Sequence, residues 1–99
     1  MYMVIGIDLV EDVRIRSLTE EERAKIFVPD DPYDKLPSVF ALREAAVKAC
    51  GVSIAQIRIR YDGPVPQVLV DGFELSCSVS HEAGLTIAIV TGSRVRNRR

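Results

Sequence analysis

The spacing of apolar residues changes along the chain, and each spacing predicts a different element. Residues 2–10 form an apolar, β-branched run of strand length that is interrupted by one carboxylate, Asp8. In residues 40–50, together with the preceding valine, apolar side chains recur at intervals of three and four, which predicts an amphipathic helix. Pro37 suits the first turn of this helix and Gly51 the position just past its end.

The second half of the chain alternates between apolar and polar residues with a period of two. This pattern predicts strands at 57–61, 66–70, 74–81 and 85–90. Turn residues separate them at 62–64, 71–72 and 82–84. Four consecutive strands after a helix indicate an α+β fold, with the central helix packed on a mainly antiparallel sheet and a meander in the second half.

The segment between the first strand and the central helix is polar. Residues 11–27 are charged and contain a short helix that Thr19 opens, with Glu22 three residues later as its capping-box partner. Residues 28–34 include two prolines and three aspartates, which predicts a loop.

The length and composition of the chain predict a single domain. The chain has 99 residues, 47% of them hydrophobic and 27% charged, which is an ordinary globular composition. We expect one domain at 1–93 and a basic, disordered tail at 94–99, which holds four of the 13 basic residues. Four arginines without an aromatic residue for stacking make a poor specific binder of nucleic acid, so no such partner is expected.

The cysteines and the length of the N-terminal apolar run give expectations about the cellular compartment and about membrane association. Cys50 and Cys77 lack the spacing of a metal site, and no secretory leader is recognised, so reduced thiols in the cytoplasm are expected. The apolar N-terminal run is too short to span a bilayer, so no membrane partner is expected.

Three stretches contain candidate chemistry, and each also has a structural interpretation. Asp8 is a carboxylate inside an apolar strand, where it must be paired or bound to a metal, unless it caps a turn at the end of the strand. Glu44 and Lys48 lie one helical turn apart, which alone predicts only an i,i+4 salt bridge. His81, the single histidine, shares a strand face with apolar residues and could be a satisfied core residue.

Taken in order, these stretches resemble one family. The chain has Gly6-Ile7-Asp8 near its start, Phe40-Ala41-Leu42-Arg43-Glu44-Ala45 with Lys48-Ala49 in the helix, and Ser78-Val79-Ser80-His81 in a late strand. Val10-Glu11, Arg14-Ile15 and Leu18-Thr19-Glu20-Glu21-Glu22 also match. The combination is similar to the holo-acyl-carrier-protein synthases, which are small phosphopantetheinyl transferases.

This resemblance implies a reaction, a cofactor and partners. Such enzymes move the 4′-phosphopantetheine arm of coenzyme A to a serine of an apo acyl, peptidyl or polyketide carrier protein, in fatty acid or polyketide biosynthesis. By resemblance Asp8 and Glu44 hold Mg²⁺, and Glu44 also helps deprotonate the serine. Lys48 contacts the pyrophosphate and aids the leaving group. His81 and Arg43 bind coenzyme A, Arg14 contacts the carrier protein, and the chain forms a homotrimer.

The chain also departs from the family pattern. Arg43 replaces the usual lysine, Val39 replaces an arginine, and Glu82 follows the histidine where a small hydroxyl residue is common. Two helical regions are shortened or missing, one of them between the hairpin and the histidine strand. An alternative is therefore a weakened or silent protein of the same fold that binds a carrier protein or serves as a scaffold. A chance match by an unrelated α+β domain is a further alternative.

Overall fold

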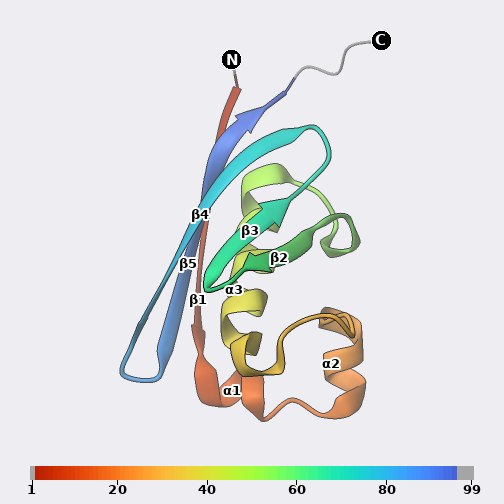
Figure 1. Cartoon of the computed structure of the whole chain (residues 1–99), viewed down its shortest axis with the longest axis vertical. Coiled ribbons are helices and arrows are strands. Elements are labelled where there is room, and N and C mark those ends of the chain that lie inside the picture. The colour runs from red at the N-terminus through yellow and green to blue at the C-terminus, as the bar shows by residue number, and fades with distance from the viewer. Residues whose placement is uncertain (1, 96–99) are drawn as a thin grey trace.

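The computed structural model describes residues 2–95 and has the expected α+β fold (Figure 1). Its elements are β1 (Tyr2–Glu11), α1 (Asp12–Arg16), α2 (Glu20–Ile26), a 3₁₀ turn (Tyr33–Lys35), α3 (Leu36–Cys50), a second 3₁₀ turn (Ile54–Gln56), β2 (Arg58–Asp62), β3 (Val65–Leu69), β4 (Phe73–Glu82) and β5 (Leu85–Arg94). All predicted strands and both predicted helices are present. The capping box of α2 is confirmed, because Thr19 accepts from the Glu22 backbone N–H and Glu22 accepts from that of Thr19.

The strands form two sheets, which corrects the predicted continuous meander. One sheet has the order β1-β5-β4 and the other is the β2-β3 hairpin, and all pairs are antiparallel. Pro66 in β3 has no N–H to donate to a neighbouring strand, and its carbonyl accepts from the Cys77 thiol of β4 instead. The other neighbour of β5 in its sheet is β1, which is distant in sequence.

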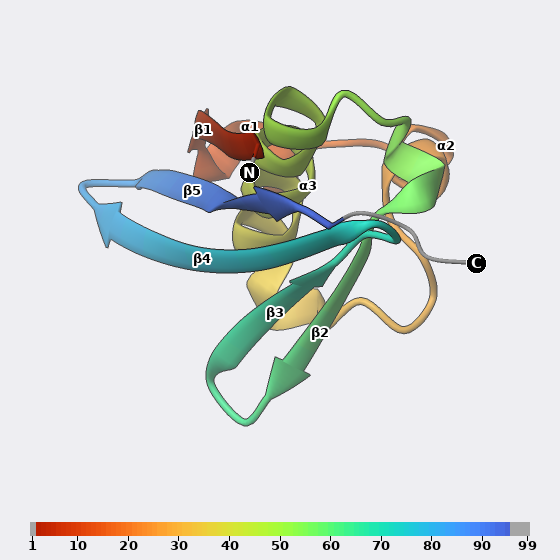
Figure 2. The same ribbon diagram turned by 90° about the horizontal axis from the view of Figure 1, so that it is seen from above.

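Helix α3 lies between the three-stranded sheet and the hairpin (Figures 1 and 2). Both sides of the helix are covered, so it is buried over more of its circumference than the predicted single stripe, with buried residues Leu36, Pro37, Ser38, Val39, Ala41, Leu42, Arg43, Ala45 and Ala46. Gly51 ends the helix in the left-handed conformation, with φ of 69°.

Gly6 of β1 sets how closely α3 approaches the sheet. A Cβ atom built on Gly6 would lie 2.0 Å from the Ala45 carbonyl oxygen and 2.7 Å from the Ala49 nitrogen. No side chain fits there, so the glycine allows the backbone of the helix to rest on the strand. This contact brings Asp8, two residues further along β1, beside the last turns of the helix.

The opposite face of the three-stranded sheet carries no helix (Figure 1). Its apolar side chains on β1 are Met3, Ile5, Ile7 and Leu9, each between 53% and 66% exposed. On β5, Leu85 and Ile87 continue the same surface, since Ile87 lies opposite Leu9. We refer to these six side chains as the open face.

Two further expectations concern the ends and the membrane. Strand β5 runs through Arg94, one residue into the predicted tail, and residues 96–99 lie outside the described part of the chain. None of the helices within residues 2–95 has the length and apolar character needed to cross a membrane.

Candidate functional site

The carboxylate of Asp8 meets the ammonium group of Lys48 where β1 and α3 cross. Lys48 Nζ lies 2.9 Å from Asp8 Oδ1 and 3.0 Å from the carbonyl oxygen of Ile7. Asp8 lies inside β1, opposite Ala88, so the alternative in which it caps the end of the strand is wrong. The simple helical pair is also wrong: among residues 2–95, Lys48 forms its ion pair with Asp8 and not with Glu44.

One oxygen of Asp8 has no partner. The Asp8 side chain is 13% exposed, and its Oδ2 atom is buried without a hydrogen bond. A buried carboxylate oxygen without a partner costs about 1–3 kcal/mol or more, so such atoms require an explanation. Glu44, which is partly exposed, lies one helical turn before Lys48 on the side of α3 that faces this strand.

The donor set suits a hard divalent cation. Carboxylate oxygens are the ligands that Mg²⁺ prefers, and it is commonly held by one or two of them together with water and substrate phosphates. Within residues 2–95 no group of three or more His, Cys, Asp or Glu side chains could hold a metal alone. The unpartnered Oδ2 of Asp8 therefore fits a cation that also uses oxygens of a bound substrate.

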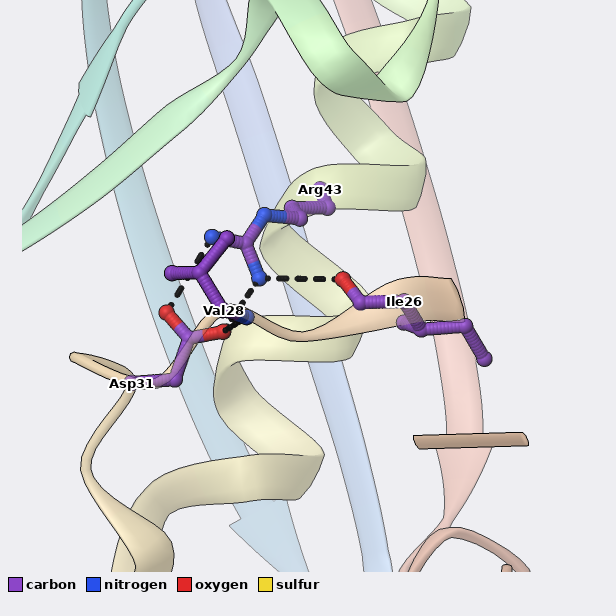
Figure 3. Close-up of polar contacts among 4 residues, drawn as sticks. All are labelled: Ile26, Val28, Asp31 and Arg43. Carbon is purple, nitrogen blue, oxygen red and sulfur yellow. Dashed lines mark hydrogen bonds and ion pairs between the residues drawn. The ribbon is translucent and has the colours of Figure 1, made fainter. Parts of the chain in front are cut away.

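Arg43 takes a different role from the predicted contact with coenzyme A. Its guanidinium Nη1 and Nη2 donate to the two carboxylate oxygens of Asp31 at 2.7 and 3.1 Å, and Nη1 also donates to the Ile26 carbonyl (Figure 3). The two side chains are only 4% and 2% exposed. Asp31 also accepts from the backbone N–H of Val28. The pair thus ties the loop after α2 to the middle of α3, and the guanidinium is almost completely buried there.

His81 lies at the rim of a second group of polar residues. Its Nδ1 atom is 2.8 Å from Thr86 Oγ1 and its Nε2 atom is 3.4 Å from Ser38 Oγ. It lines a cavity of about 500 Å³ together with Arg16, Lys35 and Tyr61. Burial raises the pKa of the Tyr61 phenol, so this group stays protonated at neutral pH. His81 is exposed and therefore not a core residue, although its ring shares the inward side of β4.

Arg14 lies on α1, apart from these groups. Its guanidinium carbon is 5.6 Å from the centre of the Phe40 ring, and the residue is exposed. An exposed cation stacked on an aromatic ring remains available to an acidic partner.

Sequence reasoning missed several residues of these clusters. Asp31 is one of three aspartates in a loop, and nothing in the sequence indicated which of them would be buried. Asp12, Ser38 and Thr86 carry no motif, and the fold brings them to His81 from separate elements. The sequence held one signal for this cluster, which is the position of Thr86 within the apolar strand predicted at 85–90.

Two known proteins are similar to most of this chain. No family model matches the chain. The holo-acyl-carrier-protein synthase of Chlorobaculum tepidum is 32% identical over 88% of this chain and 95% of its own length. The corresponding synthase of Chlamydia trachomatis serovar L2 is 35% identical over 67% of this chain and 71% of its own. The chain belongs to the holo-acyl-carrier-protein synthase family.

A solved member of this family has the same fold. The Helicobacter pylori holo-acyl-carrier-protein synthase, determined in complex with coenzyme A, superposes with a TM-score of 0.68 at 28% identity. The match covers 87% of this chain and 96% of that one. The family fold is thus retained even though only Val70, Asp71 and Gly72 separate β3 from β4 in this member.

Proposed function

We propose that this protein transfers the 4′-phosphopantetheine arm of coenzyme A to a serine of an apo acyl, peptidyl or polyketide carrier protein. The observation that carries the proposal is the contact of Lys48 with Asp8, whose second oxygen is buried without a partner. A scaffold has no reason to keep such a carboxylate in an apolar strand, because its burial lowers stability. Membership of the synthase family and the complex of the Helicobacter pylori relative with coenzyme A support the same reaction.

The reaction is a displacement at phosphorus. The serine oxygen of the carrier protein forms a bond to the β-phosphorus of coenzyme A, and the bond from this phosphorus to the leaving 3′,5′-ADP breaks. Glu44 accepts the serine proton, directly or through water. Lys48 contacts the pyrophosphate and stabilises the negative charge that develops on the leaving phosphate. Its exposed side chain can turn from Asp8 toward a bound substrate, since it is 54% accessible.

Asp8 and Glu44 would hold Mg²⁺. When bound, the ion would neutralise charge on the pyrophosphate. The residues fit this role because Asp8 Oδ2 has no hydrogen bond and both groups are carboxylates. Mg²⁺ keeps several waters and substrate oxygens, so two protein ligands are enough.

The partners follow from the same proposal. Arg14 would contact the acidic carrier protein. We further propose a homotrimer in the cytoplasm, in which neighbouring subunits cover the open face of the sheet. An exposed apolar surface of this kind is typical of an interaction site.

The alternative is a catalytically silent protein of the same fold that binds a carrier protein. Two observations favour it. Val39 occupies the position of a family arginine and is fully buried, and Arg43 is bound to Asp31. The valine and the Arg43–Asp31 ion pair each leave less positive charge for binding the phosphates of coenzyme A.

Mass spectrometry distinguishes the two functions. The protein is incubated with coenzyme A, Mg²⁺ and a panel of apo carrier proteins, and the intact mass of each carrier is measured. A mass gain equal to one phosphopantetheine arm is expected on at least one carrier. Binding of a carrier without any mass gain would favour the silent protein.

Replacement of Lys48 tests the assignment within the site. Lys48→Ala should reduce kcat by about 10²–10³-fold, because one electrostatic contact to the developing charge is lost. Its thermal midpoint should fall as well, because Asp8, which is only 13% exposed, loses its ion-pair partner, so the rates are compared at a temperature at which both proteins are folded. Lys25→Ala, which removes an exposed lysine of α2, is the matched control and should keep the wild-type rate. An unchanged rate for Lys48→Ala would contradict the role of this residue.

A further inference from the structure

A chain of hydrogen bonds connects four elements around His81. Thr86 Oγ1 of β5 donates to Asp12 Oδ1 of α1 at 2.6 Å. The same Thr86 oxygen lies 2.8 Å from Nδ1 of His81 in β4, and His81 Nε2 lies 3.4 Å from Ser38 Oγ in the first turn of α3. Thr86 is fully buried, so water does not compete for its hydroxyl group.

The donors and acceptors along this series of hydrogen bonds determine which ring nitrogen of His81 is protonated. An ionised carboxylate only accepts, so the single proton of the Thr86 hydroxyl must point to Asp12. The Thr86 oxygen can then only accept from the ring, which requires a proton on Nδ1 of His81. In the neutral imidazole Nε2 is therefore the unprotonated nitrogen, and it accepts from the Ser38 hydroxyl.

The backbone holds these groups in register. His81 and Thr86 lie directly opposite each other at the end of the β4–β5 hairpin. The backbone N–H of Asp12 donates to the Gly84 carbonyl in the turn of the same hairpin at 2.9 Å. Asp12 is thus fixed by its main chain at the position where its carboxylate meets Thr86.

We infer that Asp12 and Thr86 are positioning residues that hold His81 in the Nδ1–H tautomer and aim its Nε2 atom into the cavity beside Ser38. The inference deepens the proposed function, because it rests on the nucleotide end of coenzyme A being the ligand there. The cavity of about 500 Å³ is within the range of small-molecule sites. Arg16 and Lys35 contribute two positive charges to its lining, and Asp12 and Asp34 contribute two negative ones.

The tautomer can be measured without any ligand. His81 is the only histidine, so a ¹⁵N-labelled sample gives one imidazole spin system. When the ring is neutral, in a spectrum recorded at alkaline pH, we expect a protonated Nδ1 and an unprotonated Nε2. Thr86→Val keeps the shape of the side chain but removes the hydroxyl, and should shift the ring toward the Nε2–H tautomer. Thr86→Ser should restore the wild-type signature.

A matched control separates this effect from a general change in β5. Thr91→Val makes the same substitution in the same strand, at a hydroxyl that donates to the Val4 carbonyl and does not contact His81. It should leave the imidazole spectrum unchanged. A wild-type ring in the Nε2–H form, or a Thr86→Val spectrum identical to that of the wild type, would overturn the inference. The wild-type spectrum alone is decisive if Thr86→Val does not fold.

The kinetic consequence is a separate readout. A contact to the nucleotide end is made equally in the ground state and the transition state, so its loss raises KM and leaves kcat unchanged. Thr86→Val should raise the KM for coenzyme A about tenfold, because in the Nε2–H tautomer the ring can no longer accept at Nε2 a hydrogen bond from an amino or hydroxyl group of the nucleotide end that takes the place of the Ser38 hydroxyl. Failure of the wild type to modify any carrier would contradict the proposed function but not the tautomer. The Nδ1–H form with an unchanged KM in Thr86→Val would contradict the role in binding coenzyme A.

Discussion

The two ion pairs formed within residues 2–95 differ in how far they are removed from water. The side chains of Arg43 and Asp31 are almost completely buried, whereas Lys48 is half exposed at its contact with Asp8. A buried pair is costly to break, because the remaining charge stays in an apolar environment, while an exposed pair contributes at most about 1 kcal/mol. The Arg43 pair, which is buried on both sides, is therefore expected to matter most for stability, whereas the exposed ammonium group of Lys48 remains available for chemistry.

Removal of Asp31 tests this difference at the scale of one residue. Asp31→Ala should lower the free energy of unfolding by about 3–5 kcal/mol, because Arg43 is left buried without its partner and Val28 loses an acceptor. Denaturation in urea measures the change. Asp30→Ala, at the exposed neighbouring aspartate, is the matched control and should stay within about 0.5 kcal/mol of the wild type. Equal effects of the two substitutions would show that the pair is not structural.

At the scale of elements, the close crossing of β1 and α3 depends on Gly6. Gly6→Ala should cost about 3 kcal/mol or more, since a Cβ atom would meet the Ala45 carbonyl at 2.0 Å and the helix would have to move. Gly51→Ala is a useful comparison, because its Cβ atom would meet nothing within 4 Å and only the left-handed φ of 69° is unfavourable. It should cost about 1–2 kcal/mol. Thermal denaturation of both variants ranks the two costs, and the reverse order would contradict the close-packing argument.

The β4–β5 hairpin contains a residue whose replacement should stabilise the protein. Ala83 and Gly84 both have positive φ, 52° and 77°, which is the requirement of a type I′ turn. Alanine tolerates this conformation poorly, whereas asparagine is favoured there. Ala83→Asn should therefore raise the free energy of unfolding by about 0.5–1 kcal/mol, seen as a higher thermal midpoint. Ala83→Val, a β-branched residue at the same position, should lower it, and a higher midpoint for that variant would refute the explanation.

At the scale of the whole molecule, the open face is the feature that is least expected of a stable monomer. A chain of 99 residues buries a small core, and here one side of its main sheet presents six apolar side chains to solvent. Covering this surface with neighbouring subunits would remove that apolar area from water.

A charge on the open face tests the proposed trimer. Ile5→Glu should shift the protein toward the monomer in sedimentation at micromolar concentration, because the carboxylate would be buried between subunits. Val65→Glu places the same charge on an exposed valine of the β2–β3 hairpin, away from the open face, and should not change the mass. A wild type that sediments as a stable monomer would rule out the assembly.

Local pattern determined which elements this protein forms. Periods of two and of three to four residues, the Thr19 capping box, Pro37 and Gly51 located the strands and helices, because these signals act between residues close in sequence. The order of the motifs also identified the family, and the strand carboxylate Asp8 was recognised as a group that needs a partner.

Only the tertiary structure decided which distant residues meet. Lys48 pairs with Asp8 and not with Glu44, Arg43 is held by Asp31, and Thr86 connects Asp12 to His81. Likewise, β5 pairs with the distant β1, and β4 and β5 lie in a different sheet from β2 and β3. These contacts depend on how whole elements pack. For example, Gly6 lets α3 rest on β1, where Lys48 meets Asp8. Such packing is set by the balance of many long-range contacts, which the spacing of residues along one stretch does not specify.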